Sequence, residues 1–315
     1  MKALLFPGQG SQLVGMGSEL HENFKLVKDI FSIADEKLNY PISKIILNGP
    51  AEVLQLTKNT QPAIMIVSYA IFSVIKKEFG FDFKEFKFFA GHSLGEYSAL
   101  VCSDSLKFED ALFLLHERGK AMQEAVPEGK GSMLAILGQS LDEVKRILNE
   151  REDKDKICEI ANDNTEGQII ISGDKECIEK TQLYLKNKKI KTIPLKVSAP
   201  FHCSLMKSAA KNMQDKILKT FFAKPRFNVV SNVTSEVENN PEKIKKLLVE
   251  QIYSTVRWRE SILKMIDEKI DNFVEVGPGK ALTGMIKRMP QNKNVNCFSV
   301  NTINDIKNLS NEFKK

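Results

Sequence analysis

The segment Gly91-His92-Ser93-Leu94-Gly95 has the residue types and spacing of a nucleophile motif, G-x-S-x-G. It follows a short apolar run, residues 87–90, and precedes an apolar stretch, residues 94–102, that predicts a helix. A serine at the apex of a sharp strand-to-helix turn needs small neighbours, which the two glycines supply. The amide of Leu94, at the start of that helix, is placed to stabilise an oxyanion. The alternative is a glycine-rich turn with an idle serine, and the flanking strand and helix favour a nucleophile.

A nucleophilic serine needs a base, and the best candidate among four histidines is His202. His21 lies on the polar part of an early helix. His92 is adjacent to the serine, so its side chain should leave the turn in another direction, and His116 lies off the apolar stripe of its helix. His202 lies where a loop meets a helix, a position at which functional residues concentrate. The alternative is a solvent-facing or helix-capping histidine.

Arg118 lies on the side of its predicted helix, residues 106–126, that should be buried. It shares that stripe with four apolar residues, Ala111, Leu114, Leu115 and Met122. A buried guanidinium needs an anionic partner. Taken alone, the arginine is expected to pair with an internal carboxylate, whereas a nearby nucleophile favours the carboxylate of a substrate.

The order of the predicted elements indicates a small domain inserted into a larger one. After a composition shift at Pro127–Gly131, strands and helices follow in the order βαββαβ, which is typical of a ferredoxin-like unit. The predicted elements are a strand at 132–137, a helix at 140–149, strands at 157–162 and 168–172, a helix at 174–188 and a strand at 192–197. We therefore expect a large α/β domain at 1–128 and 199–315, and a small domain at 129–198.

Composition excludes several functional classes. The 315 residues carry 46 Lys and Arg against 40 Asp and Glu, and because the two signs are interspersed, a nucleic-acid surface is disfavoured. The net charge of +6 suits an acidic protein partner or a phosphorylated substrate. Five cysteines without C-x-x-C disfavour a disulfide framework and a zinc site, which predicts a cytoplasmic protein. There is no run of 18 apolar residues, so we expect no membrane span.

Taken together, the motifs resemble those of malonyl-CoA:acyl-carrier-protein transacylases, which load fatty-acid synthesis. The resemblance covers nearly the whole chain in the family's order. The matching segments are Phe6-Pro7-Gly8-Gln9-Gly10-Ser11-Gln12, Gly91–Ala99, Arg118, Phe201-His202-Cys203, Gln251–Ser254, Val256-Arg257-Trp258 and Glu275-Val276-Gly277-Pro278-Gly279. The resemblance implies a hydrolase-like parallel-sheet α/β domain interrupted by a ferredoxin-like one.

The resemblance also implies a role for each residue of the catalytic centre. Ser93 is the expected nucleophile and His202 its base, and the amides of Leu94 and Gln9 would form the oxyanion hole. Gln251 would orient His202 through its backbone carbonyl, in place of the usual acid.

Three further positions concern the substrate. The resemblance implies that Arg118 binds the free malonyl carboxylate in a bidentate pair. Phe201 resembles the malonyl-selecting form of its loop, and Asn162 matches a position beside the substrate.

The expected reaction transfers a malonyl group from malonyl-CoA to the phosphopantetheine thiol of acyl carrier protein through a malonyl-serine ester. No metal or tightly bound cofactor is implied. One alternative is a serine thioesterase or esterase with water as acceptor, which Arg118 and the missing acid disfavour. Another is a catalytically silent module that docks carrier protein, which the intact set of Ser93, His202 and Arg118 disfavours.

Overall fold

A six-stranded, mostly parallel sheet forms the centre of the molecule. The computed structural model describes residues 1–151 and 153–313. The strand order is β10-β9-β1-β2-β7-β8, and every pair is parallel except β7 with β8. The strands are β1 (Lys2–Phe6), β2 (Phe86–Gly91), β7 (Asn228–Val230), β8 (Val237–Glu238), β9 (Asn272–Val276) and β10 (Asn296–Val300). The chain therefore has an α/β fold, as the sequence predicts.

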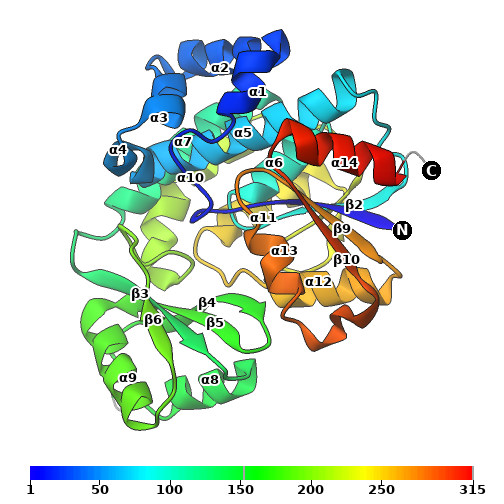
Figure 1. Cartoon of the computed structure of the whole chain (residues 1–315). Coiled ribbons are helices and arrows are strands. Elements are labelled where there is room, and N and C mark those ends of the chain that lie inside the picture. The colour runs from blue at the N-terminus through cyan, green and yellow to red at the C-terminus, as the bar shows by residue number, and fades with distance from the viewer. Residues whose placement is uncertain (152, 314–315) are drawn as a thin grey trace.

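Helices cover both faces of this sheet (Figure 1). In β1, Leu4 and Phe6 belong to one apolar core, whereas Ala3 and Leu5 belong to another. Burial on both faces explains why β1 is a continuous apolar run. The first core is built with α2 (Lys25–Leu38), α3 (Ile42–Asn48), α5 (Thr57–Lys77), α6 (Gly95–Cys102), α7 (Phe108–Glu124), α10 (Lys207–Lys219), α11 (Pro241–Gln251) and α14 (Ile303–Phe313), and the second with α12 (Trp258–Asp267) and α13 (Ala281–Ile286).

Four short helices complete the large body, which is the part of the molecule built on the six-stranded sheet. They are α1 (Ser18–Asn23), α4 (Ala51–Gln55) and the 3₁₀ turns η1 (Ser204–Met206) and η2 (Pro290–Asn294). The early helix that carries His21, α1, is short, because Phe24 has an extended backbone and separates it from α2. The Phe24 ring lies edge-on against Phe79, at 6.5 Å between centroids.

A separate four-stranded antiparallel sheet has the order β4-β5-β3-β6 (Figure 1, green, lower left). Its elements follow one another as β3 (Gly131–Leu137), α8 (Leu141–Asn149), β4 (Cys158–Thr165), β5 (Gln168–Asp174), α9 (Lys175–Asn187) and β6 (Thr192–Pro194). The two helices share one apolar core with the sheet. Ser140 caps the N-terminus of α8, because its hydroxyl accepts a hydrogen bond from the amide of Glu143.

Strand β4 is longer than the sequence predicts, since it runs to Thr165 and not to Asn162. Its second half is extended because it pairs with the large body as well as with β5. The amide of Val256 donates to Ala161 O at 2.9 Å, and the amide of Asp163 donates to Val256 O at 3.0 Å. The buried Asp163 carboxylate also binds the Arg259 guanidinium of α12 at 2.8 Å. These contacts fasten the small sheet to the large body.

Across residues 1–151 and 153–313, no helix combines the length and the apolar character that crossing a membrane requires.

Candidate active site

The strained turn between β2 and α6 holds Ser93. Its φ is +54°, a left-handed conformation that costs free energy in a non-glycine residue. A Cβ atom added at Gly91 would lie 1.9 Å from the carbonyl of Gly95, and one added at Gly95 would lie 2.3 Å from Phe6 O. Strand and helix approach so closely that only glycine fits at both positions. The spacing of G-x-S-x-G therefore has a steric cause in this chain.

Ser93 and His202 are in hydrogen-bond contact, with Ser93 Oγ 2.8 Å from His202 Nε2. On the other side of the ring, His202 Nδ1 lies 2.9 Å from the backbone oxygen of Gln251. Because a carbonyl only accepts, Nδ1 carries the proton and Nε2 accepts from the serine hydroxyl. Burial, followed by the Arg118 cation, lowers the pKa of His202 to about 3. The imidazole is thus neutral and oriented to take the Ser93 proton.

The other three histidines have different partners. His92 lines the same pocket as Ser93, but its Nε2 lies 2.9 Å from Asn164 Oδ1. His116 Nδ1 lies 3.1 Å from the backbone oxygen of Lys58. The ring of His21 packs against Phe31, with centroids 5.2 Å apart.

Arg118 is 1% exposed and reaches Ser93. Its Nη2 donates to Ser93 Oγ at 3.2 Å and to Gln251 Oε1 at 2.8 Å, while Nη1 donates to Gln61 Oε1 at 2.8 Å. Within residues 1–151 and 153–313, Arg118 forms no ion pair with a carboxylate. Neutral oxygens therefore hold the guanidinium, and no carboxylate among the described residues neutralises it at contact distance.

Asn232 and Glu96, two buried residues that were not predicted from the sequence, stabilise the turn that carries Ser93. Asn232 accepts from the amide of Ser93 at 2.6 Å and donates to Gly91 O at 2.7 Å. Glu96 accepts from the amide of Asn232 at 3.0 Å and from Gln251 Nε2 at 2.7 Å. The place of Asn232 in the sequence could have indicated that it lies near Ser93. Asn232 follows the carboxyl end of β7, the parallel neighbour of β2.

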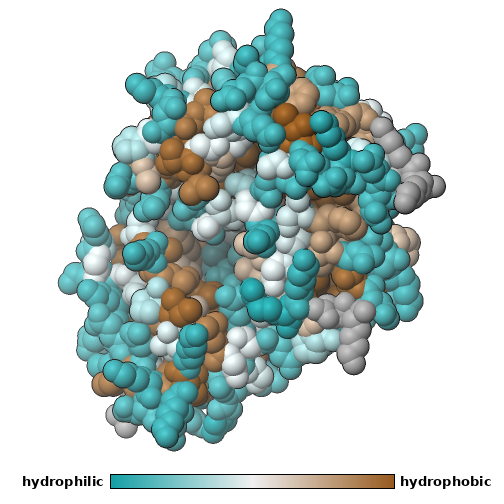
Figure 2. Space-filling model, in the orientation of Figure 1, coloured by the Kyte–Doolittle hydropathy of each residue, from teal (hydrophilic) through white to brown (hydrophobic). Residues whose placement is uncertain are grey.

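Ser93 opens into a pocket of about 720 Å³ between the large body and the small sheet. Figure 2 shows the surface hollowed in this region. Of the residues expected from the sequence, Gln9, Arg118, Asn162 and Phe201 line the pocket together with Ser93 and His202. Leu94 and Gln251 lie outside the lining, each 1% exposed. The volume is in the range of small-molecule and cofactor sites.

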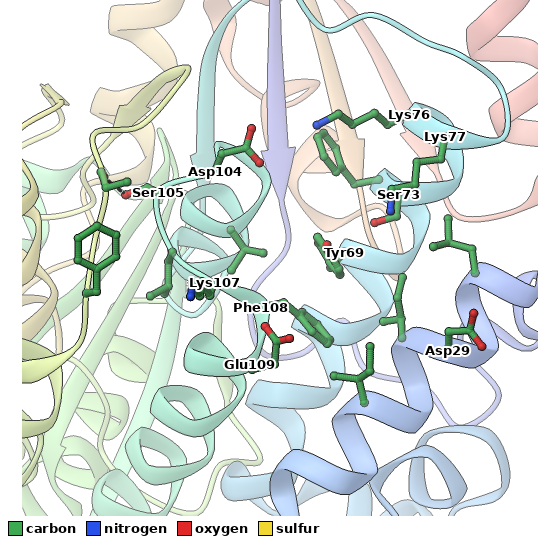
Figure 3. Close-up of a pocket in the computed structure, with 18 residues that line it drawn as sticks. Asp29, Tyr69, Ser73, Lys76, Lys77, Asp104, Ser105, Lys107, Phe108 and Glu109 are labelled. Atoms are coloured by element: carbon green, nitrogen blue, oxygen red, sulfur yellow. Dashed lines mark hydrogen bonds between the residues drawn. The ribbon is translucent and has the colours of Figure 1, made fainter.

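A second cavity, of about 450 Å³, shares no lining residue with the Ser93 pocket (Figure 3). Its wall includes Tyr69 stacked on Phe108, with ring centroids 4.6 Å apart. The charged side chains around it balance, since three lysines face three carboxylates. They are Lys76, Lys77, Lys107, Asp29, Asp104 and Glu109. The serine, histidine and arginine constellation thus belongs to the first pocket alone. In the described part of the chain, no group of three or more His, Cys, Asp or Glu side chains is arranged to hold a metal.

Comparison with known proteins agrees with this geometry. The chain matches the acyl transferase domain family over residues 3–310. It is 43% identical over 290 residues to the malonyl CoA-acyl carrier protein transacylase of Bacillus subtilis (strain 168), covering 91% of this chain and 90% of that protein. It is 41% identical over 288 residues to the protein of the same name from Escherichia coli (strain K12), covering 91% and 92%.

Solved structures agree over the full length. The acyl-carrier-protein-S-malonyltransferase from Bartonella henselae superimposes with a TM-score of 0.95 at 40% identity, covering 100% of this chain and 99% of that one. A malonyl-transacylase in complex with a type II PKS acyl-carrier protein gives a TM-score of 0.94 at 38% identity, covering 99% of each chain. With this similarity over almost every residue, the chain belongs to the malonyl-CoA:acyl-carrier-protein transacylases of the acyl transferase family.

Proposed function

We propose that this acyltransferase moves the malonyl group from malonyl-CoA to the phosphopantetheine thiol of acyl carrier protein, supplying fatty-acid synthesis. The proposal is carried by one observation in the pocket. Ser93 Oγ lies 2.8 Å from His202 Nε2 and 3.2 Å from Arg118 Nη2. A nucleophile, its base and a cation thus meet at one atom, and the relatives named above carry out this transfer according to their names.

In the first half-reaction, Ser93 Oγ attacks the thioester carbonyl while His202 Nε2 takes its proton. The amides of Leu94 and Gln9 stabilise the oxyanion, and His202 returns the proton to the departing coenzyme A thiolate. The product is a malonyl ester on Ser93. In the second half-reaction the carrier's thiol attacks this ester by the reverse sequence, which gives ping-pong kinetics.

The position of Arg118 favours a short diacid. In a malonyl ester, only one carbon separates the carbonyl from the free carboxylate, so that carboxylate stays within a few bonds of Ser93 Oγ. The guanidinium lies 3.2 Å from that oxygen and forms no ion pair with a described carboxylate of the chain. A bidentate pair with the malonyl carboxylate would complete its coordination. Phe201 and Asn162 line the same pocket, where they would limit and orient the acyl group.

The architecture supports a finer description of the fold. We assign the small unit, residues 129–198, as a ferredoxin-like domain inserted between residues 1–128 and 199–315 of a hydrolase-like domain. The strand order β4-β5-β3-β6 with two crossover helices on one core supports this assignment. A cytoplasmic location stays a prediction of the sequence.

The fate of the malonyl group tests the acceptor. Malonyl-loaded enzyme, freed of malonyl-CoA, is mixed with phosphopantetheinylated carrier protein or with buffer, and both proteins are weighed by intact mass spectrometry. We expect the malonyl mass to move to the carrier and to persist on the enzyme in buffer over the same time. Rapid release of free malonate in buffer would instead identify a hydrolase, and retention on the enzyme with carrier present would contradict the proposed acceptor.

A further inference from the structure

A buried carboxamide separates two buried charges behind the nucleophile. Gln251 Oε1 accepts from Arg118 Nη2 at 2.8 Å, and Gln251 Nε2 donates to Glu96 Oε2 at 2.7 Å. The exposed fractions of Arg118, Gln251 and Glu96 are 1%, 1% and 3%. The orientation of the amide follows from its neighbours, because a guanidinium only donates and a carboxylate only accepts. Guanidinium, amide and carboxylate therefore form one polarised chain.

The hydrogen-bonded chain from Arg118 through Gln251 to Glu96 meets two opposing needs. The buried cation must be stabilised, and its donors must stay available to a substrate. A cation buried without any counter-charge is costly, which an internal carboxylate would relieve. A carboxylate in direct contact would occupy the guanidinium donors that a substrate carboxylate needs. With Gln251 between them, Glu96 supplies the counter-charge at one amide's distance, and Arg118 Nη2 still reaches Ser93 Oγ at 3.2 Å.

We propose that Glu96 is a positioning residue that fixes the Gln251 carboxamide, holds Arg118 toward Ser93 without pairing with it, and thereby sets the preference for acyl groups with a free carboxylate. The inference rests on the proposed role of Arg118 in malonyl binding. It adds to that role a residue that touches neither the substrate nor the reacting atoms.

The same carboxylate is joined to the nucleophile turn, so the test must separate selectivity from general activity. Glu96 accepts from the amide of Asn232, and Asn232 accepts from the amide of Ser93. Removing the charge of the Glu96 carboxylate can thus slow acylation by every thioester. Only an effect that passes through Arg118 distinguishes a substrate with a carboxylate from one without.

The test measures kcat/KM for enzyme acylation by malonyl-CoA and by acetyl-CoA in Glu96→Gln. This change keeps the side-chain shape and one oxygen but removes the charge. Burial raises the pKa of Glu96 to about 7, so assays at pH 8 compare the variant with an ionised carboxylate. We expect the malonyl value to fall about 10- to 100-fold, the range for losing a hydrogen bond to a charged group, and the acetyl value to fall much less. An unchanged or raised malonyl-to-acetyl ratio would overturn the proposal.

A double-mutant cycle locates the effect. If Glu96 sets selectivity through Arg118, adding Glu96→Gln to Arg118→Ala should not lower the malonyl-to-acetyl ratio further. A further fall of that ratio in the double variant would contradict the inference. If Glu96→Gln does not fold, Gln251→Met breaks the bridge while leaving the carboxylate, and the same fall in the ratio is expected. An unchanged ratio in that variant would also overturn the proposal.

The matched control is Glu275→Gln. Glu275 is another fully buried carboxylate, and it accepts from the amides of Leu282 and Thr283 at the start of α13, apart from the pocket lining. Its loss should lower stability while the malonyl-to-acetyl ratio stays at the wild-type value. The outcomes also separate the two proposals. If Arg118→Ala lowers both substrates equally, the proposed role of Arg118 fails; if it is selective and Glu96→Gln is not, only this inference fails.

Discussion

His202 Nδ1 donates to the main-chain oxygen of Gln251 at 2.9 Å, so a backbone carbonyl stands where a serine hydrolase has a carboxylate. The carbonyl fixes the tautomer of the ring but brings no full charge to stabilise an imidazolium. Nearby, the Arg118 cation further disfavours the protonated ring. The His202 ring is therefore oriented without being made strongly basic, which suits its proposed role as the base in an attack on a thioester, whose thiolate leaves easily.

Replacing His202 should stop acylation while the fold persists. The residue has a φ of +58°, so His202→Asn is the better variant, because asparagine tolerates this conformation. We expect acylation by malonyl-CoA to slow on the order of 10³-fold or more, as for other members of such triads. His116→Asn is the control, since its ring bonds the backbone of Lys58 outside the pocket lining. Equal loss of acylation in both variants, at unchanged stability, would disprove the assignment of the base.

The steric demand at the nucleophile turn predicts a large and local loss of stability. In Gly95→Ala the new Cβ would lie 2.3 Å from Phe6 O, a backbone atom that cannot move aside. We expect the free energy of unfolding, measured in urea, to fall by more than about 3 kcal/mol, or the protein not to accumulate in folded form. Gly284→Ala is the matched change, because its Cβ would meet nothing closer than 3.8 Å. If the two variants unfold at similar urea midpoints, strand and helix do not pack as closely at Gly95 as described.

Much of this arrangement was predictable from local sequence. The nucleophile turn was predicted because strand, glycine spacing and helix adjoin one another within residues 86–102. The βαββαβ order was predictable because each of its elements carries its own hydrophobic pattern.

What the sequence did not predict depends on contacts between distant segments. Glu96 and Asn232 are 136 residues apart, and nothing near either one indicates that they share a hydrogen bond. The end of β4 was misplaced because the backbone of the distant Val256 pairs with Ala161 and Asp163, where the expected strand ended. Likewise, no local pattern tells whether a buried Arg118 meets a carboxylate or the oxygens of Gln61 and Gln251.

Arg118→Ala should separate malonyl from acetyl transfer. Losing a charge-assisted pair shielded from water costs about 2–5 kcal/mol, a factor of roughly 30 to several thousand in malonyl kcat/KM. Acetyl-CoA brings no carboxylate, so its value should change little or rise. Arg118→Lys should recover only part of the loss, because an ammonium lacks the planar fork. Steady-state rates with both thioesters check this, and an equal fall for the two would mean that Arg118 is purely structural.

The buried Glu96 should make stability depend on pH. Burial raises its pKa from 4.5 to about 7, against opposing hydrogen bonds from Asn232 and Gln251 and the charge of Arg118. The folded state thus binds this proton more tightly than the unfolded state, so stability is lost as pH rises from 4.5 through 7. Between pH 4.5 and 8, wild type should lose up to roughly 3 kcal/mol relative to Glu96→Gln.

Urea titrations of both proteins across this pH range measure that difference. A constant gap between the two curves would show that Glu96 does not titrate there. A gap that changes in the opposite direction would mean that the carboxylate is stabilised and not penalised by its surroundings.

The central claim is that Ser93 carries the malonyl group, and intact mass spectrometry of the enzyme after brief mixing with malonyl-CoA tests it most directly. Wild type should gain the mass of one malonyl group, and peptide mapping should place it on Ser93. Ser93→Ala should gain none, although His202 and Arg118 remain in place. A malonyl adduct that forms on Ser93→Ala at the wild-type rate would contradict the account.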